Sequence, residues 1–124
     1  MHSDLAALQG SWEQVAFEEN GVSNPPDEYG AAGSLTTFHQ NRFAVWSAKG
    51  VLLLEGRFEL GPSADPKTVD WIDNTGPDAG KVLPAIYRLD GDHFVFVAAD
   101  EGAPRPTEFR TGPGQTMRSF LRRR

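Results

Sequence analysis

Short apolar segments alternate with turns along the whole chain. Toward the end of segment 51–60, apolar and charged residues alternate with a period of two, which places them on opposite faces of a β-strand. The apolar face of this segment holds Leu52, Leu54, Phe58 and Leu60. The 13 glycines and 9 prolines are spread along the chain rather than gathered in one linker, which is typical of an all-β domain.

The same pattern predicts eight strands, at 11–18, 34–39, 42–48, 51–60, 67–73, 81–89, 92–99 and 115–122. Most of the connections are of hairpin length and none holds a crossover helix, so the strands should pair antiparallel. Closure into a barrel removes the exposed sheet edges. A helical turn at 3–8 precedes the first strand, with Ser3 as its cap. We therefore predict an all-β fold, an eight-stranded antiparallel up-and-down β-barrel with a short N-terminal helical turn.

Particular turn and strand residues refine this prediction. Asn20-Gly21 has the chemistry of a type I′ hairpin turn after the first strand. One further helical turn is expected to start near Pro26. Gly56 lies inside a predicted strand and suggests a bend or bulge, and Pro84 inside another suggests a bulge or an unpaired position.

Length and charge limit the function classes. The 124 residues form one domain, 1–124. The net charge of −5 argues against broad attraction to nucleic acid or anionic membranes, and no apolar run is long enough for a membrane span. The arginines near the C-terminus fit either a solvated strand end or a phosphate or partner contact; they are Arg118, Arg122, Arg123 and Arg124. The N-terminus lacks signal-peptide features, so we expect a cytoplasmic protein, or an exported one whose signal peptide has been removed.

Four motifs in order carry a family resemblance: "LQGSW" at 8–12, "PKTVDW" at 66–71, "GPDAGKVLPAIYRLDGD" at 76–92 and "RPTEF" at 105–109. Together they resemble the bacterial lipocalin-like domain family typical of planctomycetes, a calycin-type barrel of unassigned function. The resemblance implies a lipocalin-like barrel in which Gly10 and Trp12 belong to the closed end. It also implies a basic residue of the last strand, Arg122 or Arg123, above the Trp12 indole in a cation–π contact.

Catalytic and metal-binding patterns are lacking in the sequence. There is no cysteine and no G-x-S-x-G motif, and the three histidines, His2, His39 and His93, do not have metal-ligand spacing. "GPDAGKV" has neither the spacing nor the Ser or Thr of a phosphate-binding loop. Asp70 and Asp73 fall on opposite faces of one strand. We predict no catalytic residues, no metal and no cofactor.

The barrel interior supplies the candidate ligand-binding residues, which are Leu54, Phe58, Trp71, Tyr87, Phe96 and Arg105. An eight-stranded barrel is either just filled by its side chains or holds one small ligand, so each apolar member of this set fits core packing as well as ligand contact. Tyr87 and the tryptophans add polar groups to an apolar wall. Arg105 and Glu108 either anchor the long final loop or form an anion site at the barrel mouth.

Three functional hypotheses follow. The first is a non-enzymatic module that binds a small, largely apolar ligand in the interior, and it requires a cavity of at least a few hundred Å³. The second is a protein-interaction or inhibitor module that acts through the barrel rim or the termini. The third is an enzyme with Arg105, Glu108 or His93 at the open mouth; it has the least support, because no catalytic constellation is present.

Overall fold

The computed structural model describes residues 4–19, 21–24, 34–61, 63–75 and 79–123. Its elements are α1 (Asp4–Leu8), β1 (Gly10–Glu19), β2 (Val22–Asn24), β3 (Leu35–His39), β4 (Arg42–Trp46), β5 (Leu52–Gly61), β6 (Thr68–Asp73), β7 (Val82–Asp90), β8 (His93–Ala99) and β9 (Gln115–Arg123). Several predicted features lie outside the described residues: the cap at Ser3, the turn near Pro26, and the residues His2, Asn20 and Arg124.

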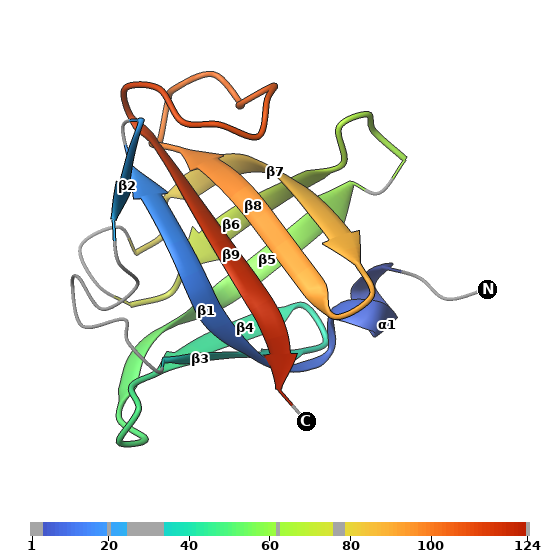
Figure 1. Ribbon diagram of the computed structural model, residues 1–124, viewed down its shortest axis with the longest axis vertical. Helices are drawn as coiled ribbons and strands as arrows, with labels where there is room; N and C mark the ends of the chain where they lie inside the picture. The colour runs from blue at the N-terminus through green and yellow to red at the C-terminus, as the bar shows by residue number, and fades with distance from the viewer. Residues whose placement is uncertain (1–3, 20, 25–33, 62, 76–78, 124) are drawn as a thin grey trace.

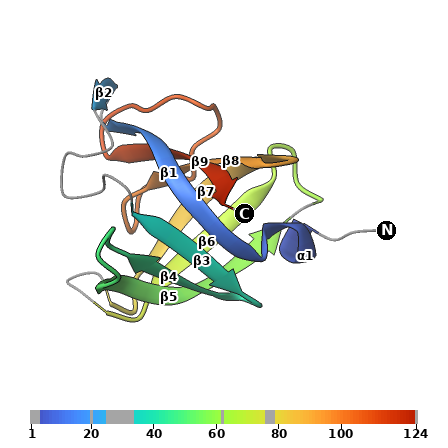
Figure 2. The same cartoon turned by 60° about the horizontal axis from the view of Figure 1, so that its bottom comes forward.

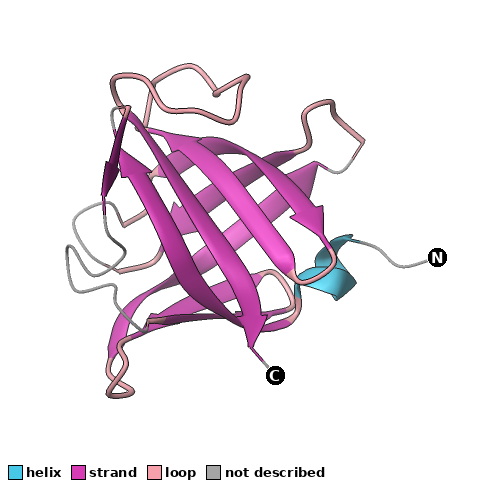
Figure 3. Cartoon of the chain, viewed as in Figure 1, coloured by secondary structure: helices cyan, strands magenta, loops and turns pink. Residues whose placement is uncertain are grey.

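The barrel is closed and antiparallel, as predicted. From β3 to β9 each strand pairs with the next in sequence, and β1 completes the ring by pairing with β3 on one edge and β9 on the other. Figures 1 and 3 show this single wall of strands wrapped around one interior. Eight strands, β1 and β3 to β9, therefore form an up-and-down barrel with no free edge between β1 and β9.

The short strand β2 is the one element that the sequence pattern did not predict. It pairs antiparallel with the end of β1, with Glu19 opposite Val22, so that Gly21 lies in a two-residue connection at φ +84°. The hairpin is thus where the Asn-Gly pair predicts it. Three residues are too short a strand to leave a periodic pattern.

Gly56 has a different role from the predicted bend or bulge. It pairs with Phe43 without a register shift, and a Cβ added to Gly56 would lie only 2.7 Å from Cε1 of the Phe43 ring. Glycine is needed there because a Cβ would meet the Phe43 ring and, closer still, the backbone carbonyl of Ile72. The bulge in this strand pair falls at Leu53 instead, between the partners of Val45 and Trp46. Pro84 pairs with Asp70 of β6 without a shift, so there is no bulge, but it has no partner in the β7–β8 ladder, which starts at Ala85; it is thus unpaired on that side, as one of the two predicted alternatives has it.

A continuous aromatic core fills the part of the barrel next to α1. Trp12 and Phe94 are fully buried, and their ring centroids are 6.0 Å apart. Phe38 meets Phe58 edge to face at 5.4 Å, and Phe58 in turn contacts Trp71 at 5.5 Å. Such contacts add to the free energy of burial. This core fixes the strands around it and occupies only the half of the interior next to α1.

Figure 2, turned from the first view, shows α1 at one end of the barrel and β2 at the other. The helix α1 has five residues, and no described helix is long and apolar enough to cross a membrane.

Candidate functional site

The barrel end next to α1 is closed by Trp12. Its side chain has no exposed surface, and its indole N–H donates a 2.8 Å hydrogen bond to the carbonyl of Leu8, the last residue of α1. The guanidinium carbon of Arg122 lies 4.3 Å from the Trp12 ring centroid. Of the two arginines offered by the family resemblance, Arg122 takes this position, whereas Arg123 donates to the Glu13 carboxylate at 2.9 Å.

Arg122 is well supplied with acceptors at this end. It donates to the backbone carbonyls of Ala7 and Gln9, and its Nε lies 3.1 Å from the Asp92 carboxylate. Gly10 supports the same arrangement, because its φ of +113° is a conformation that residues with side chains rarely adopt. The helix α1, the Trp12 indole and the Arg122 guanidinium together close this end, and the N–H groups that they use have hydrogen-bond acceptors.

Tyr87 belongs to the closed end and does not line the cavity described below. It is 2 % exposed, and its hydroxyl donates a 2.6 Å hydrogen bond to Asp4, which also accepts from Lys67 at 2.9 Å. Burial and the hydrogen bond to Asp4 raise the pKa of Tyr87. For Asp4, burial favours a higher pKa, but the hydrogen bonds from Tyr87 and Lys67 prevail and lower its pKa. This cluster ties α1 to the barrel.

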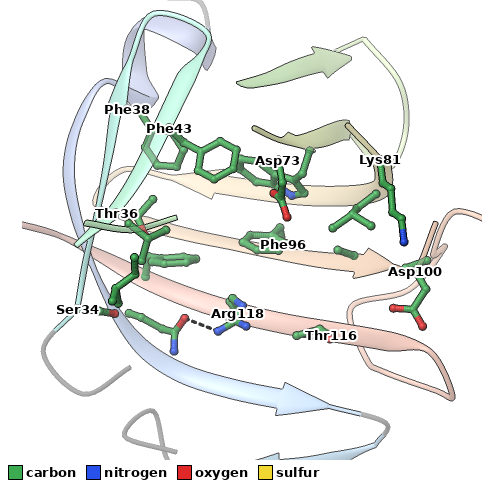
Figure 4. A pocket seen from close by; sticks show the side chains of 18 of the residues that line it. Ser34, Thr36, Phe38, Phe43, Asp73, Lys81, Phe96, Asp100, Thr116 and Arg118 are labelled. Atoms are coloured by element: carbon green, nitrogen blue, oxygen red, sulfur yellow. Dashed lines mark hydrogen bonds between the residues drawn. The ribbon is translucent and has the colours of Figure 1, made fainter. Parts of the chain in front are cut away.

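A cavity of about 630 Å³ occupies the opposite half of the interior. Its lining includes Ser34 before β3, Asp73 at the end of β6, Lys81 before β7, Asp100 after β8 and Thr116 in β9. Each of these residues lies at or next to the end of its strand that is farther from α1. The cavity therefore opens on the side of the barrel away from Trp12. Figure 4 shows these side chains around the opening. We call this space the open-end cavity.

Aromatic rings form the inner part of the open-end cavity. The Trp71 ring lies 4.9 Å from Phe96 and 5.4 Å from Phe43, and Phe96 stacks on Phe120 at 5.9 Å. Phe38 completes this wall. The polar side chains of the lining cluster nearer to the opening (Figure 4), so the cavity combines an aromatic base with a polar mouth.

Of the six predicted ligand-binding residues, Trp71 and Phe96 line the open-end cavity. Phe58 is 1 % exposed and lies within the aromatic core, and Leu54 packs partly buried against that core. The bulge at Leu53 breaks the expected alternation in β5, and Leu53 rather than Leu54 reaches the cavity. A strict period of two cannot anticipate a one-residue insertion in the ladder.

Arg105 was predicted as a ligand-binding residue, but it does not line the open-end cavity. Arg105 donates to the Asp70 carboxylate at 2.7 Å and to the carbonyl of Ala85 at 2.8 Å. Phe109, in the same loop, lies under Arg88 with 4.3 Å between the guanidinium carbon and the ring centroid. The long final loop is therefore anchored to β6 and β7. The suggested partner Glu108 pairs with Arg110 instead.

Arg118 is the main cavity residue that sequence reasoning missed. It lies on β9, lines the open-end cavity and donates from Nη1 to Oε1 of Gln14 at 2.9 Å. Its guanidinium carbon is 4.5 Å from the Phe17 ring centroid. A signal was present in the sequence: Arg118 is four residues before Arg122, so a strand that points Arg122 inward also points Arg118 inward.

The charge of Arg118 has little compensation nearby. Among the described residues, no carboxylate forms an ion pair with this guanidinium. Burial lowers the pKa of Arg118 from its ordinary value, and the charge of Glu19 opposes that shift. Arginine has so high an ordinary pKa that Arg118 stays charged at neutral pH.

Two further donors beside the cavity are unsatisfied. Nε2 of Gln14 and Nε1 of Trp71 are buried and have no hydrogen-bond partner in the described part of the chain. The other two indoles differ, since Trp12 donates to Leu8 and Trp46 donates to the Thr37 hydroxyl at 3.1 Å. Buried polar groups are normally paired, so the unpaired donors set this region apart.

Metal or catalytic chemistry finds no support in the described residues. They contain no group of three or more histidine, aspartate or glutamate side chains placed to hold a metal ion. His39 precedes one turn and His93 follows another. Both are exposed, and neither lines the cavity. Comparison with known proteins finds no match to this chain among family models, curated proteins or solved structures.

Proposed function

We propose that this protein binds a small molecule with a largely apolar body in the open-end cavity. The observation that carries the proposal is the cavity itself: about 630 Å³ lies within the range of small-molecule sites, in a barrel whose other end is closed. Its aromatic wall offers a ligand a large apolar surface, and burial of apolar surface contributes about 25 cal/mol per Å².

The chain's family is part of the same proposal. We place it with the lipocalin-like domains that its four motifs resemble, on the strength of the motif order and of the cation–π contact between Arg122 and Trp12. Neither the interaction-module hypothesis nor the enzyme hypothesis has a comparable arrangement behind it in the described residues. A binding role is therefore the function that the geometry supports best.

Titration with the neutral fluorescent probe N-phenylnaphthylamine tests the proposal. We expect saturable binding to the wild-type protein, with one probe per chain. The substitution Ala98→Phe adds a ring inside the cavity, because Ala98 is part of the lining, and should weaken binding at least about tenfold through steric exclusion.

Ala44→Phe is the matched control. Ala44 lies between Phe43 and Val45, which both line the cavity, so its own side chain points to the outside of the barrel. This variant should bind the probe as the wild type does. Absence of saturable binding to the wild type, or equal binding by both variants, would contradict the proposal. If the probe binds as expected, native mass spectrometry of protein purified from its own host would identify the natural ligand.

A further inference from the structure

Two arginines of β9 occupy matching positions at the two ends of the barrel. Arg122 lies over Trp12 of β1 at 4.3 Å, and Arg118 lies over Phe17 of β1 at 4.5 Å. Arg122 has three acceptors, two carbonyls and the Asp92 carboxylate. Arg118 has one described acceptor, the amide oxygen of Gln14. A guanidinium carries five N–H donors, and the described residues accept a hydrogen bond from one of those on Arg118.

The surroundings of Arg118 are rich in donors. Gln14 uses its oxygen to accept from Arg118, which leaves its Nε2 without an acceptor on the same side of the cavity. Gln14 is itself only 6 % exposed, so this nitrogen is withdrawn from bulk water. A buried donor without a partner costs about 1–3 kcal/mol, and a ligand oxygen would remove that cost after a small shift of the side chain.

The acidic residues of the cavity lie on another part of its lining. Asp73 comes from the end of β6, and Asp100 and Glu101 follow β8. Glu101 lies 3.9 Å from Lys81, which offsets part of its charge. In Figure 4 the ring of Phe96 lies between Asp73 and Arg118. An anion bound at Arg118 and Gln14 is thereby kept apart from the Asp73 carboxylate.

We propose that the open-end cavity selects ligands that carry one anionic group, a carboxylate or a sulfonate, on an apolar body, and that Arg118 binds this group with Gln14 beside it. The inference rests on the proposed function. Arg118 is the one arginine in the described lining of the cavity, which matches a ligand with a single anionic group. The aromatic wall of Phe43, Trp71 and Phe96 receives the apolar body, while the anion accepts hydrogen bonds from Nη of Arg118 and Nε2 of Gln14.

The test compares two probes that share one skeleton. Anilinonaphthalenesulfonate is anionic, and N-phenylnaphthylamine is the same fused rings and phenylamine without the sulfonate. Both are titrated by fluorescence into the wild type, Arg118→Met and Arg123→Met. Methionine replaces the stem of arginine as far as Nε and removes the charged end of the guanidinium. Arg123 is the control, because it lies on the same strand and pairs with Glu13 on the outside of the barrel.

We expect Arg118→Met to weaken the anionic probe about 10- to 100-fold and to change the affinity for the neutral probe by less than about twofold. Arg123→Met should bind both probes as the wild type does. Because the neutral probe reports an intact cavity, it separates loss of anion recognition from loss of folding. Arg118→Lys keeps the charge without the fork of donors and should fall between the wild type and the methionine variant.

Three outcomes would overturn the inference. In the first, the anionic probe would bind Arg118→Met as tightly as it binds the wild type, which would mean that Arg118 is merely hydrated in the cavity. Both probes lose affinity equally, which would assign Arg118 to the shape of the cavity alone. Arg123→Met weakens the anionic probe as much as Arg118→Met, which would indicate general charge attraction. Failure of the neutral probe to bind the wild type, by contrast, contradicts the proposed function itself.

Discussion

The two ends of the barrel differ in how their buried polar groups are paired. At the closed end, the indole N–H of Trp12 has an acceptor and Arg122 has three. At the open end, the indole N–H of Trp71 has no described partner and Arg118 has one. Satisfied polar groups stabilise a fold, whereas groups left without partners are available to a ligand. The contrast distinguishes Arg122, which stabilises the closed end of the barrel, from Arg118, which is available to bind a ligand.

The largest effect on stability is expected at the closed end. Trp12→Ala removes a side chain with no exposed surface, together with its hydrogen bond to Leu8, and should lower the free energy of unfolding by about 3–5 kcal/mol. Phe96→Ala, at the partly exposed cavity wall, should cost less, about 1–3 kcal/mol, but should weaken the neutral probe. Urea denaturation of both variants checks this order, and equal costs would break the comparison of the two ends.

The two arginines should differ when each is replaced by methionine. Arg122→Met removes the ion pair with Asp92 and the hydrogen bonds to two carbonyls, so we expect a loss of about 2–3 kcal/mol in the free energy of unfolding. Arg118→Met removes a buried charge that has little compensation, so its effect should stay within about 1 kcal/mol and can be stabilising. Thermal unfolding of the two proteins measures the difference. A greater loss from Arg118→Met would show that Arg118 is structural.

A smaller effect with a pH signature is expected at Asp4. Asp4→Asn weakens the hydrogen bonds from Tyr87 and Lys67 and should cost about 1 kcal/mol at neutral pH. Because the pKa of Asp4 in the fold lies below its ordinary 3.8, its contribution is complete above that pH and is lost as the pH falls through the lowered pKa. The variant and the wild type should therefore converge in acid. Asp90→Asn, at an exposed position, serves as the control for the loss of one carboxylate.

Sequence periodicity predicted the barrel well because most of the connections between its strands are short and because apolar and polar residues alternate within strands. It failed where geometry depends on a partner strand. The role of Gly56 depends on the Phe43 ring and the Ile72 carbonyl of the neighbouring strands, and the bulge at Leu53 breaks the alternation of β5. Neither can be read from one strand alone.

The candidate site was only partly predictable for a similar reason. Trp71 and Phe96 were recognised as interior aromatics and do line the cavity. Tyr87 was placed with them because a period of two gives its face but not its height along the barrel, and its height puts it beside Asp4. Arg118 was grouped with a charged C-terminus, although its spacing from Arg122 gives it the same inward face.

The most direct test of the contrast between the ends is a proton–nitrogen NMR titration of the three tryptophan indole N–H groups with anilinonaphthalenesulfonate. Each signal is assigned with its Trp→Phe variant. We predict a saturable shift of the Trp71 signal, because Trp71 lines the open-end cavity and its N–H has no described partner. The signals of Trp12 and Trp46, whose N–H groups already have acceptors, should stay in place. A shift centred on Trp12, or no saturable shift of Trp71, would contradict the account.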